Sequence, residues 1–131
     1  MKKLHLFMLS GLFILCVNLA SVHAQDFTKT DADINKILVD TNYVRAMVVT
    51  LQPGQKSDVH THPAHFFYAL TDGTLKVTYS DGKIENYPLK SGDNGYSMPE
   101  RPHSVQNTGK KTVSFLLVEL KEHPYMDKMM K

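Results

Sequence analysis

The sequence is poor in the residues that several common kinds of site require. Its 131 residues contain one cysteine, Cys16, inside an apolar N-terminal stretch, so a disulfide framework is excluded for the rest of the chain. We find no phosphate-binding glycine loop, no nucleotide fingerprint and no recognisable nucleophile. Internal repeats and low-complexity tracts are absent too, and no helical period competes with the strand pattern. Any chemistry must come from other side chains.

The first 24 residues have the pattern of a secretory signal peptide. Lys2 and Lys3 precede an apolar run over residues 4–19, and the small residue Ala24 stands just before a polar segment. This order predicts cleavage after Ala24 and a secreted or periplasmic protein. The apolar run is close to the lower length of a membrane-spanning helix, so an uncleaved anchor is the alternative.

Removal of this leader leaves a chain without net charge. Of the 15 Lys and Arg residues, the two in the leader are lost, which leaves 13 basic residues against 13 Asp and Glu. A neutral chain without a basic patch does not indicate a nucleic acid or, after cleavage, an anionic membrane as partner. Residues 25–131 suffice for one domain with its own core. We expect a small molecule as the binding partner.

Short strands dominate the sequence from residue 36 onward. Residues 74–80 alternate between apolar and polar side chains, as in a half-buried strand. Asp72-Gly73 and Asp81-Gly82 are pairs typical of tight hairpin turns, and Pro88 places its strand at an edge or at the strand's own end. The expected strands cover residues 36–39, 43–51, 59–62, 66–71, 74–80, 83–89, 96–98 and 112–120.

This pattern predicts an all-β fold, a sandwich or barrel, over residues 36–120. Residues 25–35 precede it as a polar arm without a period, which we expect to be flexible. The tail over residues 121–131 is too short and mixed to assign.

Four histidines are the strongest functional signal. His60, His62 and His65 lie within six residues, and His103 follows in a second segment. On a strand His60 and His62 point the same way, with Cβ atoms roughly 6 to 7 Å apart. Bonds of about 2.0 to 2.1 Å from a metal to each imidazole leave room for an ion between the two rings. A third ligand must come from elsewhere.

These histidines belong to two motifs that resemble those of the cupin superfamily. The first cupin motif, G-x5-H-x-H-x3-4-E-x6-G, is matched by Gly54, His60, His62 and Gly73, but Phe66 stands where the glutamate is expected. The second, G-x5-P-x-G-x2-H-x3-N, is matched by Gly92, His103 and Asn107, while Met98 and Glu100 replace its proline and inner glycine. The resemblance implies a single antiparallel cupin-type β-barrel, also called a jelly roll or double-stranded β-helix.

The resemblance also implies a divalent metal held by His60, His62 and His103, with Phe66 unable to contribute. His65 would face away from His62 on an unbroken strand, but Pro63 interrupts the strand. We therefore predict that His65 either replaces the missing carboxylate or orients another ligand. Imidazole ligands suit Zn, Cu, Ni or Fe, and loss of the acid favours the first three. Such a site should bind a hydroxide or a small anion.

Several other side chains have open roles. Phe66, Tyr68 and Leu70 share one parity and should line the barrel, where the Tyr68 hydroxyl could contact a ligand. Arg45 either points inward to hold an anion or reaches water at a rim. The spare carboxylates are Glu100, expected in a turn, and Glu119, expected near a strand end, and neither is assigned as a base.

Two functions from different classes follow. One is a metal-dependent protein that acts on a small anionic molecule, with dioxygenase- or isomerase-like chemistry. The other is a metal-free, non-catalytic module that binds a small ligand in the barrel and in which Phe66 fills the space of the acid. Residues 43–51 are apolar on both faces, which predicts a homodimer through this strand.

Overall fold

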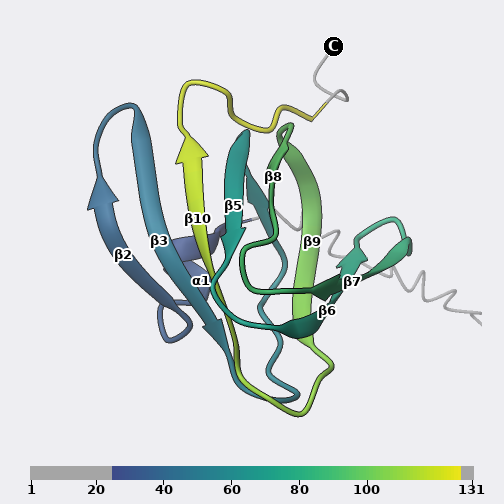
Figure 1. Ribbon diagram of the computed structural model, residues 1–131. Helices are drawn as coiled ribbons and strands as arrows, with labels where there is room; N and C mark the ends of the chain where they lie inside the picture. The colour runs from purple at the N-terminus through teal and green to yellow at the C-terminus, as the bar shows by residue number, and fades with distance from the viewer. Residues whose placement is uncertain (1–24, 128–131) are drawn as a thin grey trace, which may run out of the picture.

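The computed structural model describes residues 25–127 and consists of two facing β-sheets with one short helix (Figure 1). The first sheet has the strand order β1 (Gln25–Asp26), β4 (His60–His62), β9 (Glu100–Asn107), β6 (Gly73–Tyr79) and β7 (Ile84–Leu89). The second sheet has the order β2 (Asn35–Asp40), β3 (Val44–Leu51), β10 (Val113–Leu120), β5 (His65–Ala69) and β8 (Asn94–Ser97). The predicted all-β jelly-roll class is confirmed.

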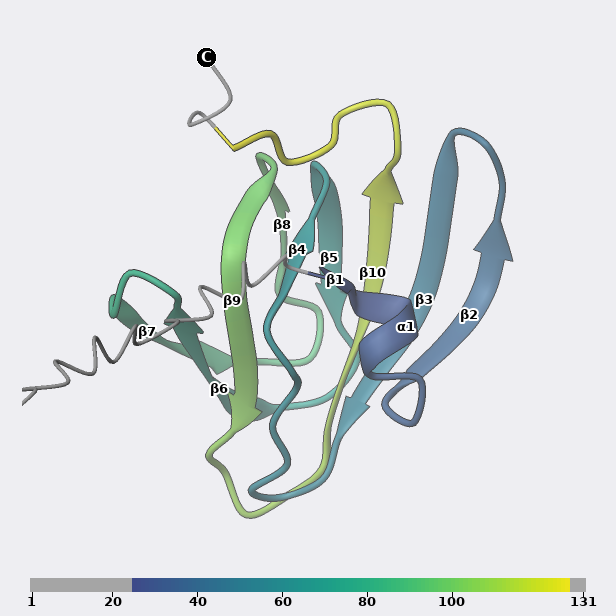
Figure 2. The same cartoon turned by 180° about the vertical axis from the view of Figure 1, so that it is seen from behind.

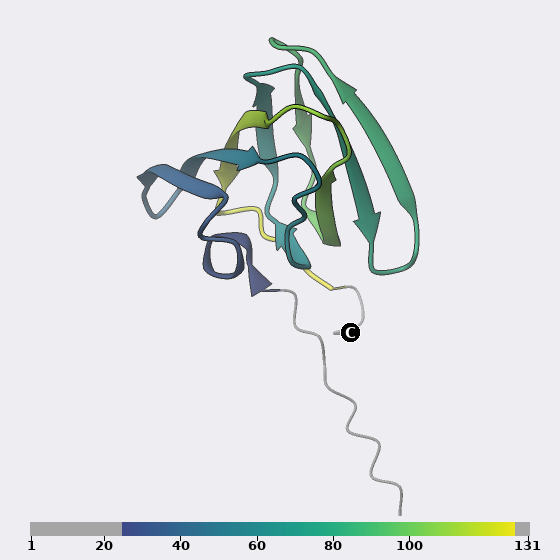
Figure 3. The same cartoon turned by 90° about the horizontal axis from the view of Figure 1, so that it is seen from below.

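The two sheets enclose the core between them. Their pairs are antiparallel except for the parallel pair β1–β4. The view from below places β2 at one side of the domain and the β6–β7 hairpin at the other (Figure 3). On β3 every second side chain is buried, which matches the period-two pattern of a strand with one dry face. The buried apolar cluster includes Met47, Val49, Leu51, Val113 and Leu117.

One of the two predicted hairpin turns is present, and the other is not. Gly82 has a φ of 87° in the turn between β6 and β7, and β7, which contains Pro88, is an edge strand as predicted. Asp72 and Gly73 do not close a hairpin, because β5 and β6 lie in different sheets. Gly73 is required for a different reason: a Cβ there would lie 2.1 Å from Cγ2 of Val113.

Strand β9 was not expected. Glu100 was expected in a turn, but it begins a strand that lies between β4 and β6. The register explains how the segment is accommodated: His60 is opposite His103, whereas His62 is opposite Glu100. Three residues of β4, 60–62, therefore span four of β9, 100–103, as in a β-bulge.

Residues 25–35, expected as a flexible arm, instead form β1 and the helix α1 (Phe27–Thr30) and enter β2. Asp26 caps the helix by accepting a hydrogen bond from the Thr28 amide. From behind, α1 lies in front of β10 and β3, next to β1 (Figure 2). Within residues 25–127 no helix is long and apolar enough to cross a membrane. The predicted signal peptide, residues 1–24, and residues 128–131 of the tail lie outside the described residues.

Candidate metal centre

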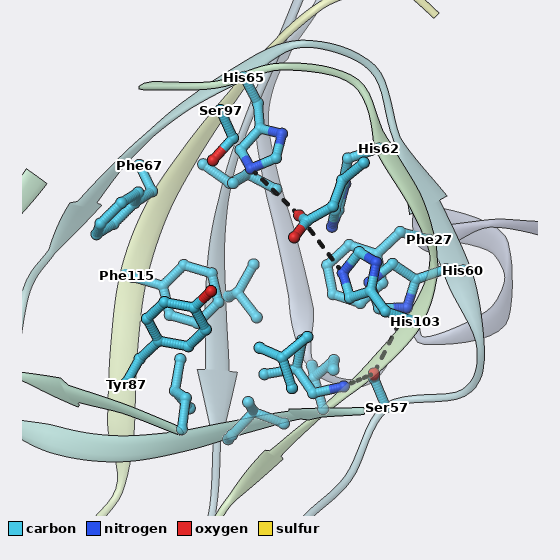
Figure 4. Close-up of a pocket in the computed structure, with 18 of the residues that line it drawn as sticks. Phe27, Ser57, His60, His62, His65, Phe67, Tyr87, Ser97, His103 and Phe115 are labelled. Carbon is cyan, nitrogen blue, oxygen red and sulfur yellow. Dashed lines mark hydrogen bonds and ion pairs between the residues drawn. The ribbon is translucent and has the colours of Figure 1, made fainter. Parts of the chain in front are cut away.

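Three histidines from two neighbouring strands meet inside the domain. One ring nitrogen from each of His60, His62 and His103 lies within 4.8 Å of the others, and all three side chains are buried. The rings of His60 and His62 are 4.7 Å apart between centroids, and those of His60 and His103 are 4.6 Å apart. Figure 4 shows the three rings converging at one end of a cavity. This triad could hold a metal ion.

Backbone carbonyls fix which nitrogen of two of these rings is free. Nδ1 of His60 donates to the Asp58 carbonyl at 2.8 Å, and Nδ1 of His103 donates to the Arg101 carbonyl at 2.7 Å. A carbonyl can only accept, so Nδ1 carries the hydrogen and the neutral ring keeps its lone pair on Nε2. Nε2 of His60 is buried without a hydrogen-bond partner. A buried lone pair left unpaired is unfavourable, and a metal ion would satisfy it.

Burial keeps two of the histidines neutral. Burial, followed by repulsion from His62 and His103, lowers the pKa of His60 to about 2. Burial also lowers the pKa of His62 well below its ordinary range, with His65 and His103 adding to the effect. A histidine must be neutral to bind a metal through its lone pair. Both rings are therefore ready to act as ligands at neutral pH.

A carboxylate, that of Glu119, determines which ring nitrogen of His62 is free. Nδ1 of His62 donates to Oε1 of Glu119 at 2.7 Å, and Glu119 is fully buried. Arg45 Nε donates to the other oxygen of Glu119 at 2.6 Å, and its Nη1 contacts Asp26 at 2.9 Å. Burial raises the pKa of Glu119, and Arg45 opposes that rise. A carboxylate behind a ligand histidine is a common feature of protein metal sites.

Arg45 is therefore neither at a rim nor free to hold an anion. Its side chain is buried and paired with Glu119 and Asp26. Burial alone would raise the pKa of Asp26, but hydrogen bonds from Arg45 and Thr28 outweigh it and lower this pKa to about 2. Asp26, Arg45, Glu119 and His62 thus form one chain of contacts that ends at the histidine cluster.

His65 points into the same cavity. Its side chain is buried, and its ring centroid lies 5.0 Å from that of His62. Nδ1 of His65 donates to the Pro63 carbonyl at 2.9 Å, so its Nε2 is also free. Because β4 and β5 belong to different sheets, the parity counted from His62 does not carry over to His65. His65 lies beside the triad rather than within it.

The predicted barrel-lining residues of this strand face the other way. Phe66, Tyr68 and Leu70 are 38%, 40% and 42% exposed, while Phe67 lines the cavity. The inward parity of β5 is set by His65, one residue away from the parity that we expected. Phe66 therefore neither supplies nor fills the position of the missing carboxylate.

Sequence reasoning missed Phe27. This residue is 3% exposed, and its ring stacks on His60 with centroids 4.0 Å apart and an interplanar angle of 29°. Phe27 also meets the edge of His62 at 5.1 Å. Phe27 is a single large aromatic residue within a polar segment, and this could have indicated that the segment packs on the core. Burial of one aromatic ring can hold such a segment in place even when it has no strand or helix period.

Beneath the histidines the cavity is apolar. It has a volume of about 150 Å³, and Figure 4 shows Phe67, Tyr87 and Phe115 around it. The remaining apolar lining comes from Ile34, in the turn before β2, and from both sheets, which contribute Val49, Leu51, Leu75, Val77, Leu89, Val105 and Leu117. The interior therefore combines one polar end with a larger apolar end.

This fold is that of a cupin. A cupin domain model matches residues 47–119, which contain both histidine segments, so the chain belongs to the cupin superfamily. A comparison with curated proteins gives no match.

Solved structures support the same fold. A cupin domain from Bordetella pertussis has a TM-score of 0.62 at 21% identity, over 67% of this chain and 92% of that one. A double-stranded β-helix protein from Klebsiella pneumoniae has a TM-score of 0.56 at 24% identity, over 67% and 76% of the two chains. An RmlC-like cupin from Methanocaldococcus jannaschii has a TM-score of 0.54 at 22% identity, over 69% and 83%. Identities this low carry the fold alone.

Proposed function

We propose that this cupin binds a divalent metal ion through His60, His62 and His103 and uses it to bind, and act on, a small anionic molecule. The observation that carries the proposal is the convergence of three buried ring nitrogens within 4.8 Å. Two of the rings are held neutral by burial, and His60 has no other partner for its Nε2. The imidazole donor set suits Zn, Cu, Ni or Fe.

The cavity narrows the class of ligand. An apolar cavity of roughly this volume holds a benzene-sized molecule. Its polar end would receive an anionic group beside the metal, while the apolar side chains of both sheets contact the rest of the ligand. We therefore propose a compact ligand with an apolar body and one anionic group, such as a small carboxylate or enolate.

A bound divalent metal would act as a Lewis acid at this position, which is compatible with isomerase- or dioxygenase-like chemistry. The chain itself would orient the ligand through the cavity walls and limit the access of water. Glu119 and the carbonyls of Asp58 and Arg101 would hold the three rings in place.

Elemental analysis tests this proposal. The protein without its leader is purified without chelator, loaded with Zn²⁺, Ni²⁺, Cu²⁺ or Fe²⁺ and desalted. A His60→Ala/His62→Ala double variant is treated in the same way, and His123→Ala, at an exposed position in the tail, is the matched control. We expect about one ion per chain in the wild type and in the control, and none in the double variant. Absence of stoichiometric metal in the wild type would reject the proposal.

The metal-free alternative, a ligand-binding module, is favoured by the apolar lining of the cavity. A small aromatic carboxylate such as benzoate serves as the probe in calorimetry with and without chelator. Binding that survives complete removal of the metal would support this alternative, whereas binding that requires the metal would support the first proposal.

We also propose that the protein is exported, on the strength of its leader pattern. Cleavage after Ala24 would leave β1 and Asp26 in the product. Expression of the full chain in a bacterium, followed by fractionation and intact mass measurement, tests this. We expect a periplasmic product that begins at Gln25. A full-length product in the cytoplasmic fraction would contradict export.

We further propose that the predicted homodimer forms through the outer face of the sheet that contains β3. Both edges of β3 are paired, with β2 and β10, which favours a contact through its outer face over a contact through its edge. One uncharged row crosses that face in direct register: Val39, Ala46, Val118, Phe66 and Tyr96. Exposed apolar rows of this kind are typical of interaction surfaces.

Sedimentation tests the dimer with two matched substitutions. Phe66→Lys places a charge in the row, and Ile84→Lys places one at an exposed position of the other sheet. We expect the wild type and the Ile84 variant to be dimers and the Phe66 variant to be a monomer. A wild-type monomer at micromolar concentration would contradict the proposal.

A further inference from the structure

Glu100 stands at an unusual position for this family and faces the histidines. In the second motif this position holds a glycine, whereas in the first motif the expected glutamate is replaced by Phe66. On a regular strand Glu100 and His103, three residues apart, would point to opposite faces. The bulge between β4 and β9 inserts one residue and brings both side chains to the inner face.

The carboxylate of Glu100 lies next to two of the free ring nitrogens, those of His65 and His103, and just outside the group of three ring nitrogens within 4.8 Å of one another. Its Oε2 is 3.7 Å from Nε2 of His103 and 3.7 Å from Nε2 of His65. Figure 4 shows these two contacts as dashed lines that leave the rings of His65 and His103. The other oxygen, Oε1, accepts a hydrogen bond of 3.0 Å from the Tyr79 hydroxyl. Burial and the nearby Glu100 raise the pKa of Tyr79, so its hydroxyl stays protonated and donates.

A divalent ion bound by these histidines would need a negative charge beside it, and the Glu100 carboxylate is in position to supply that charge. Three neutral imidazoles leave the full charge of a divalent ion uncompensated in a buried site. Glu119 is paired with Arg45 and contacts Nδ1 of His62, so its charge is already matched. Within residues 25–127, Glu100 has the carboxylate oxygen that lies within 4 Å of Nε2 of a clustered histidine, namely His65 and His103.

We propose that Glu100 supplies the carboxylate ligand that the chain lacks at Phe66 and completes a metal site with His60, His62 and His103. This inference rests on the proposed function. Two metal bonds of about 2.1 Å at a tetrahedral angle separate their donor atoms by roughly 3.4 Å, close to the 3.7 Å between Glu100 and His103. His65 then contacts the carboxylate and acts as a positioning residue.

Glu85 offers a matched control for this proposal. Its carboxylate lies 3.3 Å from the same Tyr79 hydroxyl, whose single hydrogen has its shorter contact with Glu100, but Glu85 lies on β7 and does not line the cavity. Glu100→Gln removes the negative charge beside the histidines and keeps the side-chain shape, and Glu85→Gln removes the charge on the far side of the same hydroxyl. Any effect through Tyr79 alone would appear in both variants.

The test compares Co²⁺ binding by the wild type and the two variants. Affinity is measured by competition with a chromophoric chelator, and the visible absorption of the Co²⁺ form reports the ligand set. We expect Glu100→Gln to weaken binding at least tenfold and to change the spectrum, and Glu85→Gln to match the wild type. Circular dichroism checks the fold of each variant.

Two negative results have different meanings. If the wild type takes up Co²⁺ and Glu100→Gln has the same affinity and spectrum, the role of Glu100 is rejected while the histidine site stands. If the wild type takes up no Co²⁺, both proposals are rejected. Should Glu100→Gln fail to fold, Glu100→Asp retains the charge but shortens the reach. A wild-type spectrum for the Asp variant would contradict direct ligation.

Discussion

Replacement of Glu119 by glutamine separates two contributions of one buried carboxylate. Oε1 accepts from Nδ1 of His62 at 2.7 Å, and Oε2 accepts from Arg45 at 2.6 Å. Glutamine has nearly the same shape, and its amide oxygen can still accept one hydrogen bond. Glu119→Gln therefore removes the charge that supports the His62 ring and half of the charge that surrounds Arg45.

The structure sets the size of each effect. Loss of a carboxylate behind a ligand histidine weakens metal affinity by about 10- to 100-fold, which corresponds to about 1.4 to 2.7 kcal/mol. Removal of one partner of a buried ion pair costs about 3 to 5 kcal/mol. We expect the lower end for the metal-free protein, because Arg45 keeps its contact with Asp26 at 2.9 Å.

Chelator competition with Zn²⁺ measures the first effect, and urea denaturation of the metal-free protein measures the second. Glu122→Gln, at an exposed position close by in sequence, is the control and should change neither. If an unpaired Arg45 causes the loss of stability, the Arg45→Gln/Glu119→Gln double variant should lose less than the sum of the two single variants. Wild-type Zn²⁺ affinity in Glu119→Gln would refute the assignment of Nε2 of His62 to the metal.

Three further predictions concern stability. Because burial, then His62 and His103, lowers the pKa of His60 to about 2 in the folded chain, the metal-free protein should lose stability as the pH falls below about 6.5, where the unfolded chain gains a proton. His60→Gln should reduce this slope between pH 6.5 and 5 by about 1.4 kcal/mol per pH unit, and urea titrations that show an unchanged slope would contradict the burial argument. Phe27→Ala should lower the free energy of unfolding by about 3 kcal/mol, as measured by urea denaturation, and a change below about 0.5 kcal/mol would mean that α1 does not pack in solution. Gly73→Ala should destabilise the fold by about 1 to 3 kcal/mol, because its Cβ would lie 2.1 Å from Val113; thermal unfolding should show partial relief when Val113→Ala is added, and strict additivity would argue against the clash.

Local pattern predicted much of the fold because period two and turn pairs are local signals. The alternation over residues 74–80 and the Asp81-Gly82 turn both correspond to observed elements. The spacing of His60 and His62 also predicted two side chains on one face, and the structure places both in the triad. These features depend on a few consecutive residues and need no knowledge of the partner strand.

The features that were missed depend on pairing between distant segments. The alternation of Phe66, Tyr68 and Leu70 predicted that these side chains share one face, but not which face points into the core. The chain passes from one sheet to the other between β4 and β5, so the inward face of β5 could not be counted from His62. Segment 25–30 has no period of its own and is held by packing of Phe27 on His60. Arg45 could not be placed, since its burial depends on Glu119, which lies 74 residues further along the chain.

The same distinction bears on the missing acid. Counting along the first motif finds Phe66 at the glutamate position, but in the structure this side chain points out of the domain. Counting along the second motif finds a glutamate in place of a glycine, and only the bulge opposite His60 and His62 shows that this glutamate faces inward. A glycine at position 100 would leave that inner position without a side chain, so a glutamate there adds a carboxylate without displacing another group. Considered separately, the two departures from the family pattern are the loss of the glutamate at Phe66 and an unexplained glutamate at Glu100. Considered together on the inner surface of the fold, they move the acid from β5 to β9 and place one carboxylate beside the histidines.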